Sequence, residues 1–312
     1  MAEQELRVCD AMNGLDFRIH RLLVSVWLIG GSAMASTTRA AEAGPAPDGG
    51  GRIQNMAEAI VLVPTDLRRI FSYPFQEPTA FGRFALGVGV LIAFDKPLTR
   101  VTQDHVEVPL SGFHLREAPG VFRKVGTGGT DGWLALGVTT AFLGGLVLDD
   151  DRSQRAALAT TKSMAYSVLI SQVILKSISG RKRPLDSLSQ GSSTLGGVYT
   201  SNPLDFGHSH LVTGSTQEAS SFPSFHFTLW FAAAKAYQVA YDNYAVPYTV
   251  ATVGLASNIQ GHHHWLSDMT AGGLIGTLIG SVTAHDTFDG QQAHLSAAWT
   301  HAGPTAMLDY RF

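Results

Sequence analysis

The chain has 312 residues, of which 45% are hydrophobic and 15% are charged, and its formal net charge is −3. This charged fraction lies well below the roughly 25% of an ordinary soluble domain. The composition excludes a disordered chain, and the lack of a basic excess argues against nucleic acid as a partner. Cys9 is the only cysteine, so no disulfide can form within the chain.

Residues 1–35 have the pattern of an export signal. Arg18 and Arg21 precede an apolar run at 22–31, and the small-x-small sequence "AMA" at 33–35 offers a cleavage site. The ten-residue run is short for a membrane span, although an uncleaved anchor is the alternative. We therefore expect an exported protein of the periplasm or cell envelope.

Residues 36–55 are rich in Pro, Gly and Ala and predict a flexible linker. Residues 56–290 then carry apolar segments with helical rather than alternating periodicity. These segments are 84–94, 132–148, 163–175, 227–241, 246–257 and 269–284. They predict an all-α fold, a multi-helix bundle, followed by a tail or short β-hairpin at 291–312.

The apolar segments are short for transmembrane helices. The longest uncharged stretch, 132–148, has seventeen residues and only reaches the lower limit for a bilayer span. Gln172 and Lys235 interrupt two others. We expect an exported domain that is soluble or rests on a membrane surface, with membrane spans as the alternative.

The first polar cluster is "KSISGRKRP" at 176–184, which follows an apolar helix. Gly180 and Pro184 both interrupt helical continuation. Cations near a helix C-terminus are favourable in their own right, by about 0.3–1 kcal/mol each. The same cluster also suits an anionic ligand, because arginine offers forked donors that match phosphate oxygens.

The second cluster is "SSFPSFHFTLW". Ser221 or Ser224 can cap a helix whose apolar face starts at Phe225, and Pro223 suits its first turn. A helix N-terminus presents free N–H groups and a positive dipole, which together bind anions. His226 stands in this first turn, although a lone histidine is often structural.

The third cluster is "GHHHWLSD" at 261–268. In a helix, His264 and Asp268 share a face, so the carboxylate can fix the tautomer of the ring and leave its other nitrogen nucleophilic. His262 and His263 then point elsewhere. A zinc site needs three or four protein ligands, and this stretch supplies only two, so we expect no metal.

Together the three clusters resemble the type 2 phosphatidic acid phosphatase family. The matching motifs are Lys-x6-Arg-Pro at 176–184, Pro-Ser-x-His at 223–226 and Ser-x6-His-x3-Asp at 257–268. The superfamily also contains bacterial class A acid phosphatases and vanadium haloperoxidases. The resemblance covers roughly residues 130–285 and implies an all-helical core.

The resemblance implies metal-independent hydrolysis through a phosphohistidine. His264 would be the nucleophile and Asp268 would orient it. His226 would protonate the leaving alcohol and then act as the base for water.

The resemblance also implies the phosphate-binding groups. Lys176 and Arg183 would hold the phosphoryl oxygens, together with backbone N–H groups near Ser224. Two positions depart from the family pattern: Phe225 replaces the usual glycine, and Asn258 replaces the usual arginine. A missing clamp of this kind costs about 2–4 kcal/mol of transition-state stabilisation.

We therefore expect a phosphatase that cleaves phosphate monoesters or pyrophosphates, with no cofactor. A phosphorylated lipid is the favoured substrate, with a small phosphate ester as the variant and a membrane surface as a further partner. One alternative is a vanadium-dependent haloperoxidase, in which His264 would ligate vanadate. The other is a relative that binds phosphate or phospholipid without turnover.

Overall fold

The computed structural model describes residues 56, 59–124, 130–193, 199–212, 220–257, 259–288, 293–300 and 303–310. The predicted export signal and linker, residues 1–55, lie outside them. The chain divides into two compact units, Met1–Asp48 and Gly49–Phe312, and all described elements belong to the second.

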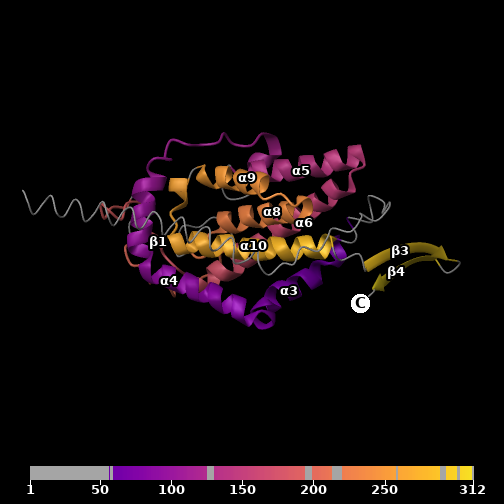
Figure 1. Cartoon of the computed structure of the whole chain (residues 1–312), viewed down its shortest axis with the longest axis horizontal. Coiled ribbons are helices and arrows are strands. Elements are labelled where there is room, and N and C mark those ends of the chain that lie inside the picture. Colours follow the sequence, from indigo (N-terminus) through magenta and orange to yellow (C-terminus); the bar gives the residue numbers. More distant parts are fainter. Residues whose placement is uncertain are drawn as a thin grey trace, which may run out of the picture. The chain divides into compact units, whose positions relative to one another are not determined.

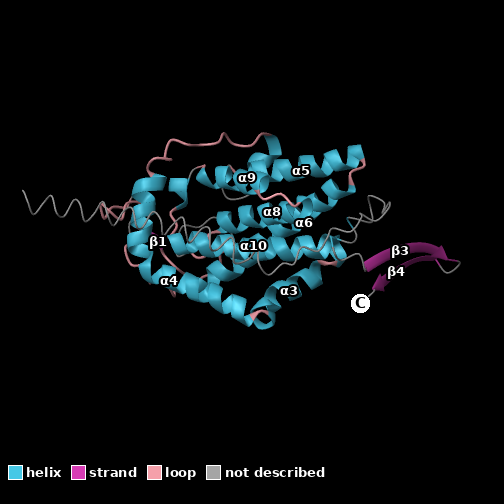
Figure 2. Cartoon of the chain, viewed as in Figure 1, coloured by secondary structure: helices cyan, strands magenta, loops and turns pink. Residues whose placement is uncertain are grey.

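The second unit is built mainly of helices (Figures 1 and 2). The α-helices are α3 (Val63–Gln76), α4 (Pro78–Thr102), α5 (Asp131–Leu148), α6 (Asp151–Ser167), α7 (Lys176–Ser179), α8 (Phe225–Tyr241), α9 (Ala245–Ala256) and α10 (Leu266–Phe288). Two π-helices, η1 (Gln103–Glu107) and η3 (Val168–Leu175), continue α4 and α6. The described residues also form the 3₁₀ helices η2 (Gly120–Lys124) and η5 (Ile259–His262).

Strands are few in the part of the chain that the structure describes. β1 (Arg183–Pro184) pairs in parallel with β2 (Tyr199–Thr200), and β3 (Ala293–Thr300) pairs antiparallel with β4 (Gly303–Tyr310). The all-α prediction with a C-terminal hairpin is confirmed, and each predicted apolar segment lies mainly in a helix. Helix α3 was not predicted, because its sequence contains two prolines and three charged residues.

Helices α6, α8 and α10 pack against one another, and glycines let α10 approach α8 closely. Gly272, Gly276 and Gly280 lie four residues apart and therefore on one face of α10. A Cβ atom added to Gly276 would come 2.3 Å from the carbonyl oxygen of Thr228. One added to Gly280 would come 2.2 Å from the carbonyl oxygen of Ala232. This contact fixes the N-terminal ends of α8 and α10 beside each other.

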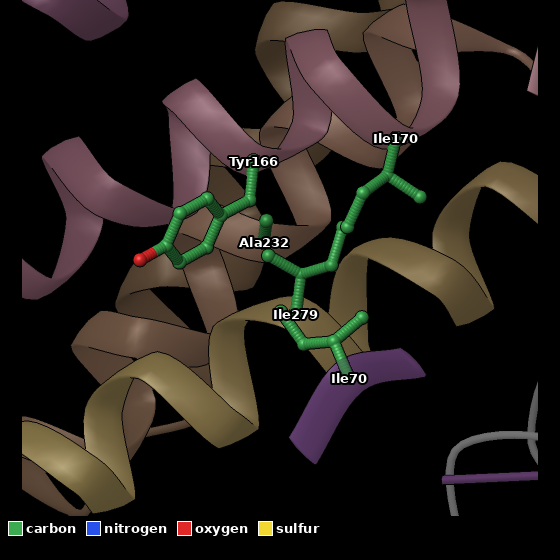
Figure 3. Close-up of a cluster of buried hydrophobic side chains, with 5 residues drawn as sticks. All are labelled: Ile70, Tyr166, Ile170, Ala232 and Ile279. Carbon is green, nitrogen blue, oxygen red and sulfur yellow. The ribbon is translucent and has the colours of Figure 1, made fainter. Parts of the chain in front are cut away.

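A cluster of buried apolar side chains joins four of the helical segments (Figure 3). Its members are Ile70, Tyr166, Ile170, Ala232 and Ile279. Burial of each of the larger side chains in this cluster stabilises the fold by roughly 1.5–3 kcal/mol.

A polar network beside this cluster fastens α3 to the bundle. The Tyr166 hydroxyl donates to Asp66 Oδ2 at 2.8 Å, and Lys162 Nζ lies 2.9 Å from the same oxygen. Arg69 on α3 also pairs with Asp286 near the end of α10. The carboxylates are buried and paired, as buried charges must be.

Three helical segments among the described residues are long and apolar enough to cross a membrane: Pro78–Glu107, Asp131–Leu148 and Asp151–Ser179. The first exceeds the predicted segment 84–94, because the helix continues through Asp95, Lys96 and Pro97. Large apolar side chains also remain exposed on α4, α5 and α9: Leu86, Val90, Phe94, Leu143, Val147, Leu148, Val246, Val250 and Val253. These helices are compatible with membrane association.

The glycine contact gives a test of the packing. Gly280→Ala forces a methyl group against the α8 backbone and should lower the free energy of unfolding by about 1–3 kcal/mol. Gly137→Ala on α5 is the matched control, because a Cβ there meets nothing within 4 Å. Alanine is the better helix former, so the control should be neutral or stabilising by up to about 1 kcal/mol. Denaturant titration of both variants measures the difference, and equal effects would contradict the packing argument.

Candidate active site

The first cluster turns back toward the bundle at Gly180. Helix α7 ends at Ser179, and Gly180 adopts the left-handed conformation with φ 51°. A Cβ atom there would lie 2.3 Å from the carbonyl carbon of His208, so the position needs glycine on both counts. The turn is as predicted, and it buries both Lys176 and Arg183.

Arg181 is fully buried, and all five of its N–H donors have acceptors. Nη1 donates to Asp268 Oδ1 at 2.5 Å and to Ser267 Oγ at 2.7 Å. Nη2 donates to Asp95 Oδ2 at 2.7 Å and to the Pro203 carbonyl at 2.6 Å, and Nε also donates to that carbonyl, at 3.1 Å. This arginine therefore has a structural role and no donor left for a phosphate.

Aromatic rings cover the same guanidinium. The Phe206 ring centroid lies 4.8 Å from its central carbon, and that of Trp265 lies 5.2 Å away. The Trp265 indole also donates to the carbonyl of Lys182 at 2.9 Å. Arg181 is thus held in a dry environment in which its ion pairs are strong.

Helix α4 caps the N-terminus of α10, a contact that the sequence did not predict. Asp95 Oδ1 accepts the Ser267 N–H at 2.9 Å, and Thr99 Oγ1 accepts the Leu266 N–H at 3.0 Å. Both acceptors are fully buried. The one signal in the sequence is a charged residue inside an apolar helical run, which is costly unless it has a partner.

The contact between His264 and Asp268 is not made on one face of a helix, so that prediction is wrong. Helix α10 begins at Leu266, two residues after His264. His264 Nδ1 nevertheless lies 3.6 Å from Asp268 Oδ2. The same oxygen accepts the Trp265 N–H at 3.0 Å and the Ser221 hydroxyl, as a carboxylate in a helical first turn commonly does.

The His264 ring is buried among charged groups. Its Nε2 lies 3.4 Å from Arg183 Nη1. Burial lowers its pKa to about 3, and the charge of Arg183 acts in the same direction, while Asp268 opposes them. The imidazole is therefore neutral near pH 7, and the Asp268 carboxylate favours the tautomer with its proton on Nδ1 and a lone pair on Nε2.

Burial also acts on the two cations beside this ring. It lowers the pKa of Lys176 well below its usual value, and the charge of Arg183 lowers it further. Burial likewise lowers the pKa of Arg183, against the influence of Asp268. Burial thus disfavours positive charge on both side chains, and a negative charge beside them would favour their charged forms.

The start of α8 differs from the prediction in detail. Ser224 occupies the N-cap position with no side-chain cap bond, and its N–H donates to the Asp268 carbonyl at 3.0 Å. Pro223 therefore precedes the N-cap, so its predicted place in the first turn is wrong. Ser221 does not cap the helix but donates to the Asp268 carboxylate. These bonds join the second cluster directly to the third.

Phe225 and His226 form the first turn of α8, as predicted for His226. The Phe225 ring is buried, 5.5 Å from the His226 ring and 6.0 Å from Lys176 Nζ. The His226 Nε2 atom lies 3.5 Å from Asp131 Oδ2 at the start of α5. Asp131 was missed, because the apolar segment was taken to begin at the next residue.

His263 makes contacts of its own, separate from those of His264. His262 ends η5, and His263 has a positive φ of 46°. His263 Nδ1 lies 3.3 Å from Asp186 Oδ1, and its ring centroid is 5.2 Å from that of Tyr199. Within the described chain, no group of three or more His, Cys, Asp or Glu side chains could hold a metal ion. Asn258 lies outside the described residues.

Residues 156–291 match the profile of the PAP2 superfamily. This match supports the PAP2 superfamily for that segment of the chain. Members of this superfamily are mostly phosphatases, and the matched segment contains all three clusters. Asp95, Thr99 and Asp131 lie before it. No curated protein and no solved structure gave a significant match.

Arg181→Met tests whether the buried guanidinium is structural. It leaves the Asp95 and Asp268 carboxylates buried without their cation, so the free energy of unfolding should fall by about 3–5 kcal/mol. Lys182→Met is the neighbouring control, because that ammonium lies 3.8 Å from Asp205 on a side chain that is 27% exposed. It should change stability by no more than about 1 kcal/mol. If both variants lose a similar free energy of unfolding, Arg181 contributes no more to the stability of the fold than Lys182.

The His264 environment predicts a pH dependence of stability. The unfolded chain binds a proton at this ring below about pH 6.5, whereas the folded chain does so only near 3. The free energy of unfolding should therefore fall as pH drops through this window. His264→Gln removes this contribution, so between pH 7 and 4 the variant should lose less stability by at least about 1 kcal/mol. Denaturant titration at each pH measures the free energy of unfolding. If the wild-type protein and His264→Gln lose the same amount between pH 7 and 4, the burial argument is wrong.

Proposed function

We propose that this PAP2 member is a metal-independent phosphatase that hydrolyses phosphate monoesters or pyrophosphates through a phosphohistidine. The observation that carries the proposal is the neutral, buried His264 ring, held between the Asp268 carboxylate and the Arg183 guanidinium. A nucleophile oriented by a carboxylate and facing a cation has the arrangement that phosphoryl transfer requires.

In the first step, the lone pair on His264 Nε2 attacks phosphorus. The nitrogen–phosphorus bond forms while the bond to the leaving oxygen breaks, and that oxygen keeps the electron pair. His226 supplies the proton that neutralises the oxygen. Asp268, 3.6 Å from Nδ1, stabilises the positive charge that develops on the imidazole ring.

In the second step, water attacks the phosphohistidine. His226, now neutral, accepts a proton from the water as the new oxygen–phosphorus bond forms. The nitrogen–phosphorus bond breaks, and its electron pair returns to Nε2 of His264. Inorganic phosphate leaves, and the enzyme regains its starting protonation.

Charge on the phosphoryl oxygens is balanced by Lys176, Arg183 and first-turn amides of α8. A bound dianion favours the charged form of Lys176, which burial disfavours. Phe225 packs beside the phosphoryl site and narrows it, as its contacts with His226 and Lys176 support. We assign Asn258 an amide contact to phosphate, weaker than the arginine of other family members.

The proposed substrate is a phosphorylated lipid, which the exported protein hydrolyses at a membrane surface. The support lies in α4, whose buried side chains include Asp95 and Thr99 while Leu86, Val90 and Phe94 are 70%, 50% and 59% exposed. The apolar residues are four apart and share one face, which is the arrangement expected of a surface that contacts lipid.

The proposal predicts that His264→Ala lowers phosphate release by a factor on the order of 10⁴ or more, the scale seen when a catalytic nucleophile is removed. His262→Ala is the control two residues away and should keep most of the activity. Phosphate release from a panel of lipid phosphates, pyrophosphates and p-nitrophenyl phosphate measures both, with EDTA present throughout.

Three results would contradict this function. Loss of activity on adding EDTA would indicate a metal-dependent reaction. Bromination of a phenol dye only after vanadate is added would indicate a haloperoxidase that uses the same residues. Tight phosphate or phospholipid binding without turnover would indicate a binding protein.

A further inference from the structure

Asp131 contributes a carboxylate to the candidate site from outside the PAP2 segment. It is the first residue of α5, is fully buried, and its Oδ2 lies 3.5 Å from Nε2 of His226. The segment that matches the superfamily begins at residue 156. One partner of the second-motif histidine is therefore supplied by a helix that the family profile does not include.

The surrounding structure fixes where Asp131 lies. The next residue, Gly132, is pressed against the 3₁₀ helix η2, because a Cβ there would come 2.3 Å from the carbonyl oxygen of Phe122. The Trp133 indole also donates to the carbonyl of Arg116 at 2.5 Å. Two successive residues of α5 are thus anchored, and the preceding carboxylate has little freedom to move away from His226.

The local electrostatics favour a carboxylate at this position. Asp131 lies at the N-terminus of α5, where the helix dipole stabilises negative charge. His226 is likewise in the first turn of α8. A helix N-terminus disfavours a protonated imidazole, so the ring needs a nearby negative charge to hold a proton for transfer.

We propose that Asp131 is the positioning residue of His226. Its carboxylate accepts the Nε2 proton, fixes the ring and stabilises the imidazolium form, which assigns Nδ1 to proton transfer. In the first step, the Nδ1 proton goes to the leaving oxygen as the phosphorus–oxygen bond breaks. In the second, Nδ1 accepts the proton from the attacking water. This role rests on the proposed phosphatase function and deepens it.

The role is tested with substrates that differ in leaving group. An alkyl phosphate releases a poor leaving group that needs the proton, whereas p-nitrophenyl phosphate releases a stable phenolate. Asp131→Asn should lower kcat/KM for hexyl phosphate by about 10²-fold or more, the scale of general acid catalysis, and that for p-nitrophenyl phosphate by less than about threefold. The inhibition constant of inorganic phosphate should stay within about twofold, because Asp131 does not bind the phosphoryl group.

Asp151→Asn is the matched control. Asp151 is the first residue of α6, as Asp131 is of α5, but its side chain is 32% exposed and pairs with Arg155 at 2.9 Å. Asp151→Asn should leave kcat/KM unchanged for both substrates. Asp131→Glu keeps the charge and displaces the oxygens by one methylene, so it should show a smaller selective loss, and it carries the test if the Asn variant fails to fold.

The possible failures are distinguishable. If the wild-type protein is active and Asp131→Asn lowers kcat/KM equally for both substrates, the positioning role is wrong while the proposed phosphatase function stands. If Asp131→Glu also lowers kcat/KM equally for the two substrates, the Asp131 carboxylate has only a structural role. If wild-type protein hydrolyses neither substrate nor any lipid phosphate, the proposed function fails and the positioning role fails with it.

Discussion

The arrangement of the candidate site depends on one buried cation. Arg181 has no contact with water, so its charge is tolerated only if acceptors surround it. Those acceptors come from α4, from the carbonyl of Pro203 and from the start of α10. Because Asp268 Oδ1 is committed to Arg181, the carboxylate is oriented with Oδ2 toward His264. A structural ion pair thereby sets the geometry of the candidate nucleophile.

The glycine face of α10 provides the second constraint. Since Gly272, Gly276 and Gly280 allow the backbones of α8 and α10 to touch, the two helices begin side by side. The hydrogen bond from the Ser224 N–H to the Asp268 carbonyl is possible only at this separation. Close helix packing in the core therefore brings together motifs that lie about forty residues apart in the sequence.

The sequence predicted what depends on local patterns and missed what depends on distant partners. Helical periodicity located the apolar segments, and glycine chemistry located the turn at Gly180. The spacing of His264 and Asp268 predicted their contact but not its form, because residues four apart also meet where a chain enters a helix. Asp95 and Asp131 could not be assigned roles, since their partners lie 172 and 95 residues away.

The charges around His264 explain why an anion is the expected ligand. Arg181 and Arg183 contribute two positive charges, while Asp95 and Asp268 contribute two negative ones near neutral pH, where even the raised pKa of Asp95, about 6, leaves it mostly ionised. These four charges cancel, so a protonated Lys176 would add a buried positive charge with no negative charge to balance it. Burial accordingly lowers the pKa of Lys176. Under the proposed function, a bound phosphoryl dianion reverses that balance, because its negative charge favours the protonated form of Lys176. The proposed phosphatase would then couple phosphate binding to proton uptake at Lys176, and this coupling would stabilise the charge that develops on the phosphoryl oxygens.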